Sequence, residues 1–272
     1  MNYKKKLKGI IKNKNSNLII GLDTDVKKIP DVFLKFNDPL YEFNKFIIKS
    51  TSEIAAGYKF NIAFYEVMKD KGFELLRKSL KLIPDSCVTI CDAKRGDIPN
   101  TNEMYAKIYF DELNFDAITL SPYIGTDSVI PFLQRKNKFV YILALTSNIG
   151  SGDFQKLKTG GKYLYEIVIQ KHLELFSSEK IGFVFGANHT IEINKYSRKF
   201  NDLSILIPGI GTQGNDLNNL MKNIHNNLFL INSSRGIIYS GNGEEGINNI
   251  KKKVVDESLI LKNNINTLKL SQ

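Results

Sequence analysis

The sequence has little cysteine, histidine or arginine, and each shortage excludes a class of protein. Its two cysteines, Cys87 and Cys91, are four residues apart on one predicted strand, where a disulfide would require distorted backbone. We therefore expect buried thiols, a reducing compartment and a cytoplasmic location. The three scattered histidines provide no zinc-ligand cluster. Only five of the 38 basic residues are arginine, which argues against nucleic-acid binding despite the net charge of +10.

Long apolar runs are also missing. No run approaches the roughly 18 residues of a membrane-spanning helix, so we expect no contact with a membrane. The basic start, "MNYKKKLKGIIKNKNSN", lacks the apolar core and cleavage site of a secretory signal. Because it leads directly into a predicted strand, we interpret it as an N-terminal helix or arm and not as a transit peptide.

The sequence does contain eight short apolar runs, separated by amphipathic stretches with helical spacing. The runs cover residues 17–23, 55–64, 86–94, 115–122, 139–147, 180–187, 203–211 and 228–236. Near-continuous apolar strands indicate a parallel sheet that is buried on both faces. Eight of them alternating with helices over 272 residues, without a linker, predict an α/β protein. We expect residues 1–272 to form one (β/α)₈ TIM barrel.

Polar residues concentrate at the carboxyl ends of these strands, where the active sites of such barrels lie. The strand ends carry Asp23, Lys59 with Asn61, Asp92 with Lys94, Ser121, Thr146 with Ser147, Pro208 and Arg235. Asp92 and Lys94 are two residues apart, so on an extended strand they point to the same side. A solvated ion pair at the rim of the sheet would be the simplest explanation. The gathering of polar groups at one end of so many strands favours a functional site.

The last two strand ends have the composition of a phosphate site. The loops "PGIGTQGND" (208–216) and "SSRGIIYS" (233–240) are glycine-rich or basic, and such loops let backbone N–H groups approach an anion. Arg235 provides a planar fork for phosphate oxygens, and Gln213 provides a further donor. A helix beginning after Arg235 would add its dipole. Alone, "PGIGTQG" would be an ordinary glycine-rich turn, and its pairing with Arg235 favours phosphate binding.

These motifs together resemble the orotidine 5′-phosphate decarboxylase family, in the subfamily typified by "DAKRGDI". The resemblance rests on "GLD", "KFN", "DAKRGDIPNT", "SPYIG", "TSN", "PGIGTQG" and "SSRG", in this order along the chain. It implies decarboxylation of orotidine 5′-monophosphate to UMP, the last step of de novo UMP synthesis, with neither a metal nor an organic cofactor.

The resemblance also implies a role for each matching residue. Lys59, Asp92, Lys94 and Asp97 match the catalytic Lys-Asp-Lys-Asp network of the family. Asp97, Ile98 and Thr101 would reach into the neighbouring subunit's site, which makes the protein a homodimer with shared active sites. The substrate-binding candidates are Asp23 and Lys59 for the ribose with Asn61 nearby, Ser147 for the pyrimidine, Gln213, Ser234 and Arg235 for the phosphate, and Pro208. We expect the helix that follows to begin near Asn102, so that "PNT" runs outward.

The implied chemistry accounts for the charges. Loss of CO₂ leaves electron density at C6, which the Lys94 ammonium would stabilise and then protonate. Flanking carboxylates favour the charged form of a lysine. Asp92 and Asp97 would also repel the departing carboxylate. The loop at 146–163, "TSNIGSGDFQKLKTGGKY", could act as a lid over the base or be a plain solvent loop.

Two other functions remain open from the residues alone. A Mg²⁺-dependent sugar-phosphate decarboxylase, such as the 3-keto-L-gulonate 6-phosphate enzymes, shares Asp-x-Lys-x-x-Asp. Its pattern has a Glu metal ligand at the end of the second strand, where this chain has Lys59. A basic RNA- or UMP-binding barrel without activity would have no need of both Lys94 and Asp97. Since the chain has no room for a phosphoribosyltransferase domain, we expect that activity to reside elsewhere.

Overall fold

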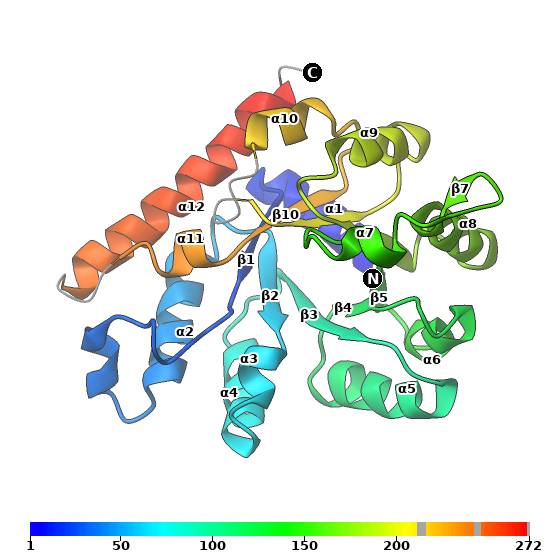
Figure 1. The fold of residues 1–272 in the computed structure, drawn as a ribbon. Helices are drawn as coiled ribbons and strands as arrows, with labels where there is room; N and C mark the ends of the chain where they lie inside the picture. The colour runs from blue at the N-terminus through cyan, green and yellow to red at the C-terminus, as the bar shows by residue number, and fades with distance from the viewer. Residues whose placement is uncertain (211–215, 242–245, 271–272) are drawn as a thin grey trace.

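The centre of the molecule is a closed barrel of eight parallel strands, seen in Figure 1 in a computed structural model that describes residues 1–210, 216–241 and 246–270. Neighbouring strands in the barrel are also neighbours in sequence, and β1 closes the ring by pairing with both β2 and β10. The strands are β1 (Leu18–Gly21), β2 (Gly57–Asn61), β3 (Val88–Arg95), β4 (Ala117–Leu120), β5 (Phe139–Leu145), β8 (Ile181–Phe185), β9 (Ile205–Pro208) and β10 (Phe229–Ser233). Each overlaps one predicted apolar run, so the predicted (β/α)₈ barrel is confirmed.

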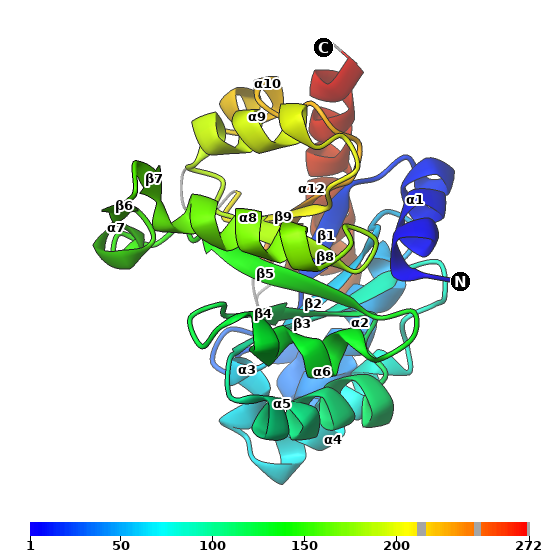
Figure 2. The ribbon, with the colours of Figure 1, turned by 90° about the vertical axis from the view of Figure 1, so that its right-hand side faces the viewer.

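Helices surround the barrel, and a small hairpin with α7 projects from it (Figure 2). The helices are α1 (Tyr3–Lys14), α2 (Pro39–Thr51), α3 (Ala63–Glu66), α4 (Asp70–Leu80), α5 (Pro99–Ala106), α6 (Ile130–Leu133), α7 (Ser151–Phe154), α8 (Leu164–Leu175), α9 (Thr190–Lys199), α10 (Leu217–Lys222), α11 (Arg235–Ile238) and α12 (Ile247–Leu270). Shorter elements are the 3₁₀ turns η1 (Asp31–Lys35) and η3 (Thr126–Val129), the π-helical turn η2 (Lys107–Glu112), and the hairpin of β6 (Lys158–Thr159) with β7 (Lys162–Tyr163).

Local sequence explains where several helices begin. The side chains of Asn2 and Asp38 accept hydrogen bonds from the first-turn N–H groups of α1 and α2, as helix caps do. Helix α5 begins at Pro99, so the predicted start near Asn102 is wrong. Proline is suited to the first helical position because its φ angle is already helical and its missing N–H needs no partner there.

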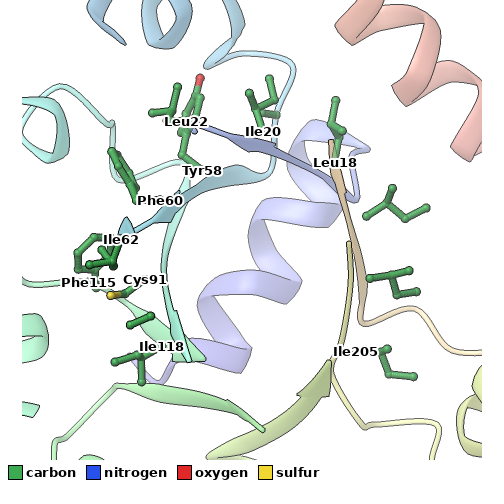
Figure 3. Close-up of a cluster of buried hydrophobic side chains, with 14 of the residues drawn as sticks. Leu18, Ile20, Leu22, Tyr58, Phe60, Ile62, Cys91, Phe115, Ile118 and Ile205 are labelled. Atoms are coloured by element: carbon green, nitrogen blue, oxygen red, sulfur yellow. The ribbon is translucent and has the colours of Figure 1, made fainter. Parts of the chain in front are cut away.

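The hydrophobic core has an outer and an inner layer. In Figure 3, labelled side chains such as Leu18, Phe60 and Ile118 point away from the ring of strands, and they belong to the layer packed against the surrounding helices. The inner layer fills the barrel and includes Ile19 and Ile90.

Helix α1 covers the end of the barrel at which the strands begin. Its buried Tyr3 and Leu7 join the inner layer, and the Tyr3 hydroxyl lies 3.1 Å from that of Tyr141 on β5. The buried Lys4 ammonium lies 2.6 Å from the Asp202 carboxylate. The predicted N-terminal helix or arm is thus a helix, and the opposite end of the barrel, where the strands finish, is available for a site.

Two smaller predictions concern the thiols and the membrane. Cys87, just before β3, and Cys91, within it, are both buried free thiols, as predicted. In the described ranges, no helix combines the length and the apolar character that crossing a bilayer requires.

Candidate active site

Lys59, Asp92 and Lys94 form an ion-paired triad where β2 and β3 end. The Lys59 ammonium lies 2.8 Å from one carboxylate oxygen of Asp92, and the Lys94 ammonium lies 2.6 Å from the other. Asp23, which follows β1, lies 3.7 Å from the Lys59 nitrogen. Only 4% of the Lys59 side chain is exposed, against 48% for Lys94. The Lys59 ammonium is therefore buried in the barrel, and the Lys94 ammonium is half-exposed.

Burial and charge oppose each other in the triad. Burial alone would lower the pKa of Lys59, but the negative charges of Asp23 and Asp92 outweigh it and raise that pKa above its usual value. Burial likewise favours the neutral form of Asp92, but the charges of Lys59 and Lys94 prevail and hold its pKa well below the usual range. Lys59 and Asp92 are both charged at neutral pH, so the site holds a fixed alternation of charge.

A bulge in β3 brings Asp92 and Lys94 together. Cys91 pairs with Ile118 on β4, and the next pair joins Arg95 to Leu120, so three residues of β3 lie opposite one residue of β4. Lys94 has a φ of 49°, in the left-handed region. The prediction that both side chains point to one side is confirmed, but Lys94 is not in the regular extended conformation on which that prediction rested. The two charges thus meet at a bulge, a feature common beside active sites.

Arg95 anchors the bulge from outside the barrel. Its guanidinium donates to the Ala93 carbonyl oxygen at 3.2 Å and to the Tyr109 hydroxyl at 3.0 Å, and it forms an ion pair with Glu66. The guanidinium also stacks on the ring of Tyr105, with 5.0 Å between its central carbon and the ring centroid. The end of β3 is thus tied to α3 and α5, which limits its movement.

A cavity of about 280 Å³ opens above the triad. Its lining residues are Lys59, Asp92, Lys94, Thr119, Leu143, Thr146, Ser147, Asn148, Val184, Leu206 and Pro208. Charged groups from β2 and β3 form one side, and aliphatic side chains from β5, β8 and β9 form the other. Such a cavity suits a flat ring with an apolar face and a charged edge, because small-molecule sites are mostly apolar with a few directed polar groups.

The cavity contains some predicted residues and several that were not predicted. Lys59, Asp92, Lys94, Ser147 and Pro208 were expected there. Thr119 and the aliphatic wall of Leu143, Val184 and Leu206 were not. Their signal in the sequence is weak. The aliphatic residues look like any other core residues, and Thr119 is a single hydroxyl inside the apolar run "AITL".

Two of the predicted phosphate residues, Ser234 and Arg235, follow β10, which lies next to β1 in the barrel. Ser234 immediately precedes α11, and a Cβ on Gly21 of β1 would lie 1.8 Å from its hydroxyl oxygen, so any larger residue there would displace the Ser234 side chain. Arg235 is exposed at the start of α11. That helix has only four residues, so the dipole predicted after Arg235 is at most that of a single turn. Gln213 lies outside the described residues.

The remaining candidates lie at the edge of the site or away from it. Asn61 ends β2, opposite Asp92 in the strand pairing. The Asp97 carboxylate accepts a hydrogen bond from the Ile98 N–H at 2.7 Å. Within residues 1–210, 216–241 and 246–270, no ion pair joins Asp97 to a lysine of the triad. Ile98 is 59% exposed, and Thr101 lies in the first turn of α5.

The loop after β5 is held to the barrel at its base. The Gln155 carboxamide accepts a hydrogen bond from the Thr146 N–H at 2.8 Å and donates one to the Thr146 hydroxyl at 2.9 Å. A ring nitrogen of His189 lies 2.9 Å from the Thr146 carbonyl oxygen. The position of Ser147, the next residue, is thereby fixed. Beyond this anchor, Ile149, Phe154 and other apolar residues of the loop are exposed.

Among the described residues, no three His, Cys, Asp or Glu side chains are grouped as ligands for a metal ion. The carboxylate with the most central place, Asp92, already contacts two ammonium groups. A divalent cation at that position would meet their positive charges.

Comparison with known proteins places this architecture in one family. The model of the orotidine 5′-phosphate decarboxylase / HUMPS family matches residues 16–250. A protein of Dehalococcoides mccartyi named orotidine 5′-phosphate decarboxylase is 44% identical over 252 residues, which are 90% of this chain and 92% of that protein. The protein of that name from Christiangramia forsetii is 46% identical over 236 residues, 85% of this chain and 86% of its own.

Solved structures agree with the sequence matches. The OMP decarboxylase of Leishmania donovani superposes with a TM-score of 0.85 at 31% identity, covering 99% of this chain and 100% of that one. The UMP synthase of Leishmania donovani gives a TM-score of 0.88 at 32% identity, and there this chain is fully covered but spans 57% of the other. From the extent of these matches, the chain belongs to the orotidine 5′-phosphate decarboxylase / HUMPS family.

Proposed function

We propose that the protein decarboxylates orotidine 5′-monophosphate to UMP and CO₂, the last step of UMP synthesis. The observation that carries the proposal is the half-exposed Lys94 ammonium, held 2.6 Å from a buried carboxylate at the mouth of a cavity with one apolar wall. The relatives that are 43–46% identical bear the name of this activity, which supports the same conclusion.

The reaction needs a cation beside the carbon that loses CO₂. Breaking that bond leaves an electron pair in an sp² orbital at C6, which no ring carbonyl is placed to delocalise well. A fixed ammonium stabilises this charge as it develops and then donates the proton that replaces CO₂. Lys94 has this role in our proposal, and Asp92 orients it. Lys59 is too deeply buried to be assigned the proton transfer to C6. Its positive charge keeps Asp92 ionised.

Negative charge at the site would act on the departing group. A carboxylate about 4 Å from the substrate carboxylate repels it by roughly 4 kcal/mol at an effective dielectric of 20, and the repulsion ends when CO₂ leaves. The charge of Asp92 is already offset by two ammonium groups. A second carboxylate would therefore repel the substrate carboxylate more strongly than Asp92 does. We assign that role to Asp97 of the partner subunit in a homodimer.

The exposed surface near Asp97 supports the dimer. Ile98, Met104, Tyr123 and Ile124 are large apolar residues that are between 48% and 83% exposed. Ile98 immediately precedes α5 and Met104 lies on it, and the other two lie on the loop after β4, which passes close to Gly96. Large apolar residues exposed in this number beside a proposed site are consistent with an interface. In this arrangement Asp97, Ile98 and Thr101 complete the site of the other subunit.

The pyrimidine, ribose and phosphate of the substrate would lie along the mouth of the barrel. Ser147 would bind the pyrimidine next to the aliphatic wall. Asp23 and Lys59 would bind the ribose hydroxyls, with Asn61 nearby. Ser234, Arg235 and Gln213 would surround the phosphate, Pro208 would contact the substrate from the lining of the cavity, and the 146–163 loop would close over the base. A single-barrel, cytoplasmic enzyme is the simplest form of this proposal, and its two buried thiols suit a reducing compartment.

The test is the loss of orotidine 5′-monophosphate absorbance when the purified protein is added in the presence of EDTA. We expect turnover that EDTA does not reduce. Lys94→Ala should lose all measurable turnover and still bind UMP in calorimetry, because the proton donor is removed and the phosphate site is unchanged. Turnover by Lys94→Ala within tenfold of the wild type would refute the role of Lys94. Absence of turnover of orotidine 5′-monophosphate, with or without Mg²⁺, would refute the proposed activity and favour the metal-dependent sugar-phosphate chemistry.

A further inference from the structure

We infer that Thr119 is a positioning residue that holds Asp92 and Lys94 in their working arrangement, an inference that rests on the proposed function. Thr119 lies on β4 and is 1% exposed. Its hydroxyl oxygen lies 3.0 Å from the Lys94 backbone nitrogen and 3.0 Å from a carboxylate oxygen of Asp92. One buried hydroxyl therefore contacts both members of the pair.

The direction of each hydrogen bond follows from the groups. A backbone N–H only donates, so the Thr119 oxygen accepts from Lys94. An ionised carboxylate only accepts, so the hydroxyl gives its one hydrogen to Asp92. The oxygen that receives this hydrogen is the one that also receives the Lys94 ammonium. Thr119 therefore fixes the rotation of the carboxylate that orients the ammonium.

The bulge explains why such a residue is needed. Because three residues of β3 lie opposite Thr119 alone, the regular ladder of backbone hydrogen bonds is interrupted at Lys94. The ladder resumes where the Ser121 N–H donates to the Arg95 carbonyl oxygen at 2.7 Å. The Thr119 side chain replaces the missing backbone acceptor, and it does so at a residue held in the left-handed region. Without the hydroxyl, Lys94 would lose the hydrogen bond that secures this conformation.

The chain contains a matched control at the other end of the barrel. The Thr89 hydroxyl on β3 accepts from the Asp116 backbone N–H at 3.0 Å and donates to the Asp116 carboxylate at 3.2 Å. Thr89 thus makes the same pair of hydrogen bonds as Thr119, but near the start of β3, away from the cavity. A loss of kcat that is common to variants of both threonines indicates a structural role. A loss of kcat that is confined to variants of Thr119 indicates that Thr119 positions the catalytic groups.

The experiment compares Thr119→Val with Thr89→Val. We expect Thr119→Val to lower kcat by about ten- to hundredfold, the effect of removing one hydrogen bond to a charged group. Its KM and its affinity for UMP should stay within about threefold of the wild type, since the phosphate and ribose contacts remain. Thr89→Val should lose similar thermal stability and keep kcat within about threefold. All rates are expressed per UMP-binding site, so that unfolded protein does not count.

Thr119→Ser and Thr119→Ala complete the set. Serine keeps the hydroxyl, and its kcat should recover to within about threefold of the wild type, whereas alanine should behave like valine. The serine–alanine comparison decides the question if the valine variant does not fold. Equal kcat for Thr119→Val and Thr89→Val, or for serine and alanine, would overturn the inference. If the wild type does not turn over orotidine 5′-monophosphate, the proposed function fails; if the wild type is active and Lys94→Ala is inactive while Thr119→Val has normal turnover, only the role of Thr119 fails.

Discussion

Replacing Asp92 by asparagine tests whether the charges of the triad depend on one another. The substitution keeps the shape of the side chain and removes the negative charge between the two ammonium groups. The Lys59 side chain is 4% exposed, so its charge would lose its nearest partner inside the protein. Asp23 would remain as a counter-charge, at 3.7 Å.

The size of the effect follows from these contacts. Removing one partner of a buried ion pair destabilises a protein by about 3–5 kcal/mol. The second contact, to Lys94, adds roughly 0–1 kcal/mol, because that side chain is 48% exposed. Since Asp23 compensates in part, we expect Asp92→Asn to lower the free energy of unfolding at pH 7 by about 3 kcal/mol.

The loss should depend on pH in one direction. The pKa of Asp92 is lower in the folded protein than in the unfolded chain, where it is about 3.9. Its contribution to stability is therefore complete above about pH 5 and is lost as the pH falls below the unfolded value. The stability difference between wild type and Asp92→Asn should narrow between pH 5 and pH 3, by up to about 1.4 kcal/mol per pH unit.

Urea unfolding of both proteins at pH 7, 5, 4 and 3 measures this difference. Other carboxyl groups titrate in the same range, but they are common to both proteins and cancel in the comparison. A loss under about 1 kcal/mol at pH 7 would show that Lys59 does not need Asp92 as a partner. A difference that stays constant or widens towards pH 3 would show that the pKa of Asp92 is not lowered by folding.

Two further predictions concern the phosphate and the dimer. Arg235→Ala should lower kcat/KM for orotidine 5′-monophosphate by the equivalent of roughly 2–5 kcal/mol and leave turnover of orotidine nearly unchanged. Arg198→Ala is the surface control. Equal losses with both substrates would show that the role of Arg235 is structural. Mixing inactive Lys94→Ala and Asp97→Ala chains should restore up to about a quarter of wild-type activity, since half of the random dimers carry one intact site. Proven subunit exchange without recovered activity would show that Asp97 acts within its own chain.

The fold was predictable because burial leaves a simple pattern in the sequence. Strands buried on both faces must be apolar along their whole length, and each such run overlaps a strand of the barrel. The polar residue that interrupts or follows a run then marks the carboxyl end. Lys59, Asp92 and Ser147 were identified in this way, and all three line the cavity.

The bulge and its partner could not be predicted, because they depend on pairing between strands. Nothing in "DAKR" shows that Lys94 adopts a positive φ angle, and nothing in "AITL" shows which hydroxyl lies opposite it. Both follow from the register of β3 against β4, which is a property of the closed barrel. The length of α11 and the anchoring of Thr146 by Gln155 likewise depend on contacts formed only in the folded chain.

In the proposed dimer, there is an energetic reason why Asp97 lies apart from the triad of its own chain. Within one chain, Asp92 lies between two ammonium groups, so folding brings opposite charges together. A second carboxylate in the same place would repel Asp92 and offset part of that stabilisation. If the partner subunit provides it, each chain folds around a balanced triad, and the repulsion arises only when the dimer forms, where burial of the apolar surface around Ile98 and Tyr123 can offset it. The charge that acts against the substrate carboxylate is then supplied by assembly and not by folding.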